Sequence, residues 1–202
     1  MSIIIFDTET TGLNPGYICQ LAYVKIIENR VEGHNHYFKV DYIEPAAQNV
    51  HHLTVEMLEK LSNGYSFEIL CDKILNDFNS SQIVIAHNYA FDSAFLRAEA
   101  RRNGGVYNAK GFCTMNRFRD ICKIESRNGR YKKPKLDELL SFLNISDDDI
   151  ISFTVKVFGT KGFGKHDARV DTAALALVVM RAAKEGLCGF AEYPQIRALE
   201  CV

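Results

Sequence analysis

Two acidic residues, Asp7 and Glu9, lie at the end of a short run, residues 2–7 (SIIIFD), that is apolar and rich in β-branched side chains. Such a run predicts a buried strand, and residues two apart on a strand point to the same side of the sheet. Like charges placed there repel each other and are costly to desolvate. Oxygen ligands of this kind suit hard divalent cations such as Mg²⁺ or Mn²⁺. The structural alternative is that Glu9 caps a turn while Asp7 stays partly solvated.

A third acid, Asp92, ends the segment AHNYAFD at residues 86–92. The apolar run 83–86 predicts a second buried strand, and a helix is predicted to begin at Phe91. Asp92 would then lie in the first helical turn, where a carboxylate interacts favourably with the helix dipole. That interaction alone could explain the residue, so the segment has both a structural and a chemical interpretation.

His166 and Asp171 occur in HDARVD, just after a segment that contains Gly159, Gly162 and Gly164. Five helical residues turn through about 500°, so the two side chains would diverge by roughly 140° if both were helical. One shared site therefore requires His166 in a loop and Asp171 on the helix. The glycines make that loop flexible, so we expect His166 to move. A histidine there is a candidate general base because its ordinary pKa lies near neutrality; the alternative is a loop histidine without a role.

Taken together, DTETTGL (7–13), HNYAFD (87–92) and HDARVD (166–171) resemble the three motifs of the DnaQ-like DEDDh family of 3′–5′ exonucleases. That family includes the proofreading epsilon subunit of bacterial DNA polymerase III. The resemblance covers about residues 2–184 and keeps the order of the motifs. A tyrosine-type branch would place tyrosine four residues before the last aspartate, where this chain has Asp167, so the histidine branch fits.

The resemblance implies an α/β ribonuclease H-like fold with a mixed five-stranded sheet flanked by helices. It implies that two divalent metal ions, Mg²⁺ or Mn²⁺, are held by four acids and that His166 takes a proton from the attacking water. The implied metal ligands are Asp7, Glu9, Asp92 and Asp171. The product would be a nucleoside 5′-monophosphate removed from a nucleic acid with a free 3′ end, single-stranded or frayed.

Four further residues are implied to contact the substrate. Thr10 and Leu13 follow the first two acids, and Asn88 precedes Asp92. His51 lies in PAAQNVHHLT (45–54), which is similar to the family's Pro…Val-His-Gly-Ile-Thr segment. The family's glycine is replaced here by His52.

Three functional classes compete. The favoured one is an exonuclease acting on DNA, with a DNA polymerase as a candidate partner; trimming of RNA 3′ ends is the alternative substrate. A non-catalytic polymerase-associated module should have lost carboxylates, whereas all four acids and the histidine are present. A nucleotide-binding protein with a phosphate loop is not supported, because GxxxxGK[ST] does not occur.

The rest of the 202-residue chain is predicted to form a single exonuclease domain over residues 1–202, with a short C-terminal tail at 185–202. Further strands are predicted at 17–27 and 31–40. Helices are predicted at 54–61, 66–78, 91–102, 115–122, 136–143 and 168–185. Residues 41–53 and 144–165 are predicted to be irregular, and His34 and His36 are expected to be exposed in a hairpin.

Composition and charge limit the remaining possibilities. Hydrophobic residues make up 47% and charged residues 24%, the balance of a soluble globular protein. No apolar run approaches a membrane span, and the N-terminus does not resemble a signal peptide. Six cysteines without a C-x-x-C pair predict reduced thiols and a cytoplasmic location. The net charge is −1, yet residues 117–135 are strongly basic, either as a solvated loop or as a rim that contacts phosphate.

Overall fold

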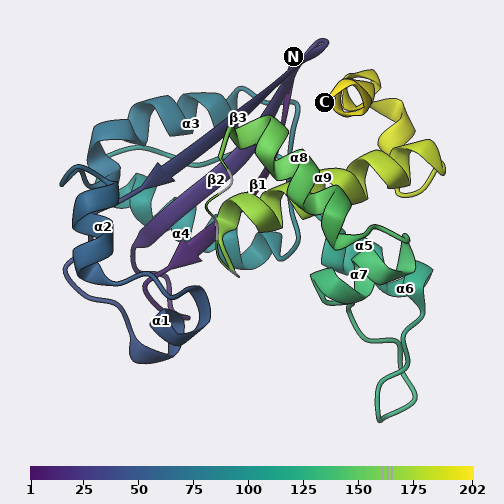
Figure 1. The fold of residues 1–202 in the computed structure, drawn as a ribbon, viewed down its shortest axis with the longest axis horizontal. Coiled ribbons are helices and arrows are strands. Elements are labelled where there is room, and N and C mark those ends of the chain that lie inside the picture. Colours follow the sequence, from purple (N-terminus) through teal and green to yellow (C-terminus); the bar gives the residue numbers. More distant parts are fainter. Residues whose placement is uncertain (161, 163, 165) are drawn as a thin grey trace.

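The computed structural model describes residues 1–160, 162, 164 and 166–202. Within these residues the chain forms one mixed sheet of five strands in the order β3-β2-β1-β4-β5 (Figure 1). The strands are β1 (Ser2–Thr10), β2 (Ile18–Ile27), β3 (Arg30–Tyr37), β4 (Ile83–Ala86) and β5 (Gly111–Cys113). The predicted mixed five-stranded sheet is therefore confirmed.

Helices connect and cover the strands. They are α1 (Pro45–His51), α2 (Val55–Leu61), α3 (Cys71–Asn79), α4 (Tyr89–Arg102), α5 (Thr114–Arg117), α6 (Arg119–Cys122), α7 (Leu136–Phe142), α8 (Asp147–Phe158) and α9 (Ala168–Lys184). Segments of 3₁₀ helix are Phe67–Leu70, Phe190–Glu192 and Pro194–Cys201. None of the helices in the described ranges is long and apolar enough to cross a membrane.

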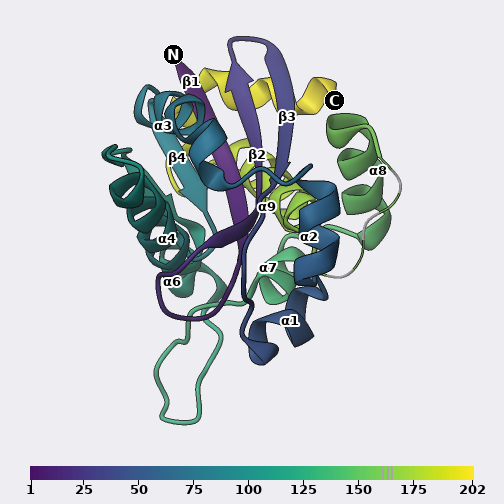
Figure 2. The ribbon, with the colours of Figure 1, turned by 90° about the vertical axis from the view of Figure 1, so that its left-hand side faces the viewer.

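The two faces of the sheet are covered by different helices (Figures 1 and 2). On β1, Ile3 and Ile5 belong to a core shared with α9, while Ile4 and Phe6 belong to a second core shared with α3 and α4. This alternation follows from the two-residue period of a strand. Asp7 and Glu9 continue the series of Ile3 and Ile5, so the fold directs both acids toward the α9 side.

Strand direction gathers the candidate motifs at one edge. β4 pairs parallel with β1, and β5 pairs parallel with β4, whereas β2 is antiparallel to β1. Carboxyl ends of parallel strands lie at the same edge of a sheet. The ends of β1 and β4, which lead into the first two motifs, are consequently neighbours.

Two segments predicted to be irregular are helical instead. Residues 41–53 contain α1, which begins at Pro45, a favourable first position because its ring fixes the helical φ and its missing N–H has no partner to lose. Residues 144–165 contain α8, whose N-cap Ser146 forms a reciprocal capping box with Asp149. In both cases the local start signal was present and outweighed the polar composition that suggested a loop.

The expectation that His34 and His36 are exposed is also wrong. Both are half-buried on β3, and the His34 ring stacks on Tyr23 with 4.5 Å between ring centroids. Burial lowers the pKa of His36 to about 4, with the nearby Lys73 ammonium as the next cause. Because Lys73 lies on α3, this environment depends on packing that the hairpin sequence does not reveal.

Candidate active site

Three of the predicted metal ligands meet at the carboxyl edge of β1. Asp7 and Glu9 extend from β1, and Asp171 extends from the first turn of α9. One carboxylate oxygen from each lies within 4.8 Å of the others. The strand period and the helix start thus place acids from sequence-distant segments close enough to share a cation.

The fourth acid, Asp92, lies in the first turn of α4 and is 3% exposed. Its Oδ1 accepts a hydrogen bond from the Thr8 hydroxyl at 2.8 Å. Its charge raises the pKa of Asp7 and of Glu9, so it acts on the same group electrostatically. Thr8 lies between Asp7 and Glu9 in β1, so its side chain points to the other face of the sheet, where it binds Asp92.

The four acids share an unfavourable electrostatic environment. Burial raises the pKa of Asp7 well above its ordinary range, and the charges of Asp92, Asp171 and Glu9 raise it further. Burial, then Asp171, raises the pKa of Glu9 to about 9. Burial raises the pKa of Asp92 to about 6 despite the opposing hydrogen bonds.

No lysine, arginine or histidine forms an ion pair with these acids in the part of the chain that the structure describes. None of the ion pairs found there includes Asp7, Glu9, Asp92 or Asp171. An all-oxygen cluster with excess negative charge fits a hard divalent cation, because bound Mg²⁺ or Mn²⁺ would replace the missing countercharge. The donor set therefore fits the predicted metal ions.

His166 lies outside α9, as the helical geometry required. It is exposed, in a turn with φ of 55°, and the helix begins after its N-cap Asp167. A positive charge on His166 would lower the pKa of Asp171, whose main perturbation is burial, which raises it. The predicted flexibility of the glycine-containing segment concerns in part residues 161, 163 and 165, which lie outside the described residues.

A polar network that the sequence did not reveal supports the start of α9. Arg169 donates to the Asp167 carboxylate at 2.6 Å and 2.9 Å, to the Tyr37 hydroxyl at 3.2 Å and to the Gly162 carbonyl at 3.1 Å. Gln20, opposite Glu9 in the β1–β2 register, donates to Asp167 at 2.9 Å. Arg169 therefore links the start of the helix to the segment that carries His166. The only local signal was an aspartate at a helix start followed two residues later by arginine.

His51 is buried against the end of β1. Its Nδ1 accepts the Leu53 N–H at 3.0 Å, which leaves the proton on Nε2 to be donated to the Thr10 carbonyl at 3.3 Å. Burial lowers the pKa of His51, which favours this neutral form. His52 adopts the left-handed conformation with φ of 60°, the conformation that the family's glycine would adopt at no steric cost.

The remaining predicted substrate contacts follow the ends of β1 and β4. Leu13 is 79% exposed in the turn after β1, and Asn88 is exposed at the N-cap of α4. His51 and His166 line one hollow of about 650 Å³ together with residues of α2 and the start of α9. Thr10, Leu13 and Asn88 thus lie at or just beyond the carboxyl ends of β1 and β4, and His51 is hydrogen-bonded to the Thr10 carbonyl.

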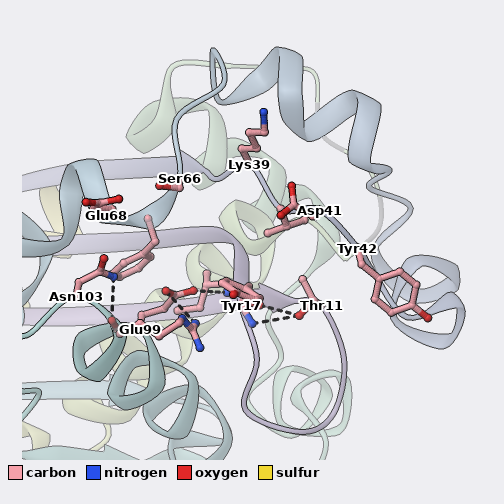
Figure 3. Close-up of a pocket in the computed structure, with 13 residues that line it drawn as sticks. Thr11, Tyr17, Lys39, Asp41, Tyr42, Ser66, Glu68, Glu99 and Asn103 are labelled. Carbon is pink, nitrogen blue, oxygen red and sulfur yellow. Dashed lines mark hydrogen bonds and ion pairs between the residues drawn. The ribbon is translucent and has the colours of Figure 1, made fainter.

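A separate hollow of about 570 Å³ lies beside the turn that follows β1, between that turn, residues 39–42 and the end of α4 (Figure 3). There the buried Glu99 accepts the Ile18 N–H at 2.9 Å and pairs with Arg102 at 2.9 Å. The Arg102 guanidinium lies 4.1 Å from the centroid of the Tyr17 ring, and Thr11 bonds to the Tyr17 backbone in the same turn. These contacts attach the turn to α4. They therefore help to hold the first motif in position.

Comparison with known proteins identifies the family. The family model for exonucleases, RNase_T, matches residues 4–179, and the chain belongs to this family. DNA polymerase III subunit epsilon of Haemophilus influenzae is 34% identical over 154 residues, which cover 71% of this chain and 57% of that protein. The same subunit from Buchnera aphidicola is 30% identical over 148 residues, covering 68% of this chain and 60% of that protein. The chain therefore spans less than two thirds of the length of these relatives.

Solved structures show the same fold. Escherichia coli exonuclease I in complex with a dA16 oligonucleotide superimposes with a TM-score of 0.65 at 17% identity, covering 95% of this chain and 42% of that chain. A zinc-bound form of exonuclease I in complex with single-stranded DNA gives a TM-score of 0.64 at 19% identity, covering 95% and 42%. The predicted DnaQ-like resemblance and the ribonuclease H-like fold are confirmed.

Proposed function

We propose that this exonuclease is metal-dependent and removes nucleoside 5′-monophosphates from the 3′ end of a nucleic acid, with DNA as its expected substrate. The observation that carries the proposal is the group formed by Asp7, Glu9 and Asp171, three acids from two distant segments with ligand oxygens within 4.8 Å. Membership of the exonuclease family connects that group to phosphodiester hydrolysis.

In this proposal, Asp7, Glu9, Asp92 and Asp171 hold two divalent ions, Mg²⁺ or Mn²⁺. Such ions supply the positive charge that favours attack by water and departure of the 3′-oxygen. His166 accepts the proton of the attacking water at an imidazole nitrogen. Its exposed position in a turn beside Asp171 supports this role, since a general base must reach the water without occupying the ligand positions.

Substrate contacts would come from the residues around the acids. Exposed Leu13 offers an apolar contact to the terminal base, and Asn88 offers an amide at the start of α4. Both ring nitrogens of His51 already bond within the chain, so His51 would touch the nucleotide through its ring edge while holding the Thr10 backbone in place. This assignment gives His51 a positioning role in addition to the predicted contact.

A DNA substrate is supported by the DNA polymerase III relatives and by the oligonucleotide in the exonuclease I structure. A DNA polymerase is accordingly a candidate partner, and trimming of RNA 3′ ends is the alternative activity. All six cysteines are free thiols, which agrees with action in the cytoplasm. A non-catalytic module is disfavoured because the structure keeps the acids together.

The test compares single-stranded DNA, duplex DNA with a mismatched 3′ end, and RNA, each in Mg²⁺, Mn²⁺ and EDTA. We expect monophosphate release that requires metal and is fastest on unpaired DNA ends. Asp7→Asn should lower turnover on the order of 10³-fold or more, because it removes a ligand from the charge-stabilising site. Glu28→Gln, at the opposite edge of the sheet, is the matched control. Hydrolysis that persists in excess EDTA would contradict the metal requirement.

A further inference from the structure

The basic stretch forms a projecting hairpin, here called the basic arm and defined as residues 123–133. Figures 1 and 2 both show it extending away from the body of the protein beside α6 and α7. It is held by hydrogen bonds from Lys132 N to the Ile124 carbonyl and from Ser126 N to the Arg130 carbonyl, each 2.8 Å. A bridge between Glu125 and Tyr131 completes the hairpin. The arm is therefore a folded element whose few contacts with the body lie at its base.

Charge distinguishes this segment from the rest of the chain. Residues 117–135 contain eight of the chain's 24 lysines and arginines and two of its 25 acids, so the remainder is net acidic. Within the described residues, Arg127, Arg130, Lys123 and Lys133 are exposed and none forms an ion pair with a carboxylate. Lys132 differs, because it pairs with Glu138 at the start of α7. The free charges are thus divided between the tip of the arm, which carries Arg127 and Arg130, and its base, which carries Lys123 and Lys133.

The base of the arm is attached to the edge that carries the acids. The arm follows β5 through α5 and α6, and β5 runs parallel to β4 and β1. His87, directly after β4, contacts the carbonyl of Pro134 through Nε2 at 3.1 Å and the hydroxyl of Thr114 through Nδ1 at 3.0 Å. His87 lies five residues before Asp92. One histidine therefore fixes the base of the arm to the second motif.

The arm offers two kinds of contact that proteins use to bind a nucleic acid strand. Arginine guanidinium groups form paired hydrogen bonds to phosphate oxygens, and Tyr131, 44% exposed, presents an aromatic face on which a base can stack. Its four-residue sides would reach on the order of 13 Å from the body at strand spacing. That length corresponds to about four phosphate spacings of a stacked strand, which is beyond the terminal nucleotide.

We propose that the basic arm binds the sugar-phosphate backbone of the substrate strand several nucleotides from its 3′ end. This inference rests on the proposed function. The net acidic remainder of the protein repels a polyanion, so the arm supplies the local attraction that orients the strand toward the acids. Sequence specificity is not expected, because phosphate contacts position a strand without reading its bases.

The test measures binding separately from hydrolysis. Fluorescence anisotropy in EDTA gives the affinity of 5′-labelled single-stranded DNA of about 20 nucleotides and of a trinucleotide, over a range of salt concentrations. We compare the wild type with Arg127→Gln/Arg130→Gln. Neutralising two phosphate contacts should weaken binding of the longer strand roughly tenfold at low salt and reduce the slope of log affinity against log salt by about 1.4. Trinucleotide affinity should stay within about twofold of the wild-type value, since the short strand does not reach the arm.

The matched control is Arg30→Gln/Lys110→Gln. Both residues are exposed, and both lie at the opposite edge of the sheet, where Arg30 begins β3 and Lys110 precedes β5. This control should bind both strands as the wild type does, although it carries the same change in net charge. An equal loss in the control and in the arm variant would show a general charge effect and would overturn the proposal.

Two other outcomes would also contradict the proposal that the basic arm binds the substrate strand. Unchanged binding of the longer strand with an unchanged salt slope would mean that the arm does not touch phosphate, and would favour a protein partner for the arm instead. An equal loss for the long strand and the trinucleotide would place the contact at the 3′ end itself. If the wild type bound DNA through the arm but hydrolysed none of the substrates in Mg²⁺ or Mn²⁺, the proposed function would fail while the arm proposal held.

Discussion

Replacing Glu9 with glutamine should stabilise the metal-free protein while it abolishes catalysis. The folded-state pKa of Glu9 is raised to about 9 by burial and then by Asp171, against an ordinary value of 4.5. A carboxyl group whose pKa is raised on folding makes its full contribution to the free energy of unfolding when the pH is below its pKa in the unfolded state. That contribution is lost as the pH rises through its pKa in the folded state. The loss therefore develops between about pH 4.5 and pH 9.

The size of the effect follows from proton linkage. At pH 7.5 the folded protein keeps a proton that an unfolded glutamate would release. Keeping this proton lowers the free energy of unfolding by about 1.4 kcal/mol for each of the three pH units above 4.5. That gives about 4 kcal/mol as an upper value, and about 2 kcal/mol if the neighbouring acids share the proton. Glutamine needs no such proton, so Glu9→Gln should raise the melting temperature by roughly 4–16 °C in a chain of this size.

The assay is thermal unfolding in EDTA at pH 5, 7.5 and 9, repeated with excess Mg²⁺. Metal should stabilise the wild type by mass action and should stabilise Glu9→Gln less, because a ligand is lost. Glu28→Gln, an exposed acid at the other edge of the sheet, should change neither profile. Destabilisation by Glu9→Gln in EDTA, or an identical pH profile in both proteins, would refute the argument that the cluster stores repulsion that a cation relieves.

Three further predictions concern the histidines. His166→Ala should lower turnover while metal affinity measured by calorimetry stays near the wild-type value; a large loss of metal affinity would make His166 a ligand instead. His36, with its pKa lowered to about 4, should destabilise the protein by about 1–2 kcal/mol, after solvent screening, as the pH falls from 6.5 toward 4. His36→Gln should make the unfolding midpoint depend less on pH over that range. An unchanged pH dependence would exclude His36 as the cause. His52→Gly should raise the free energy of unfolding, measured by urea titration, by up to about 1 kcal/mol, because a φ of 60° strains a residue that has a Cβ. A lower free energy of unfolding would show that the His52 side chain stabilises the fold by more than this strain costs.

Local periodicity accounts for what the sequence predicted well. The two-residue period of a strand was sufficient to place Asp7 and Glu9 on one side of β1, and the angular period of a helix was sufficient to separate His166 from Asp171. Both deductions depend only on residues that are close in the chain. The structure agrees, with Asp7, Glu9 and Asp171 grouped and His166 in a turn before α9.

Contacts between distant segments account for what was missed. Thr8 donates a hydrogen bond to Asp92, 84 positions away, and Gln20 donates one to Asp167, 147 positions away. No local sequence pattern predicts either contact. The lowered pKa values of His34 and His36 likewise depend in part on Lys73 of α3, a contact that the hairpin sequence does not reveal. The sequence therefore predicted the acids and the histidine of the candidate site more fully than the residues that hold them in place.

The polarity of degradation tests whether the enzyme is a metal-dependent 3′–5′ exonuclease. A DNA strand is labelled at its 5′ end in one reaction and at its 3′ end in another, and both are followed with the wild type and Asp171→Asn in Mn²⁺, with EDTA added in a parallel series. We expect a ladder of progressively shorter 5′-labelled strands and immediate release of the 3′ label as a monophosphate, with neither product from Asp171→Asn or in EDTA. Release of the 5′ label first, or equal degradation by Asp171→Asn, would contradict it.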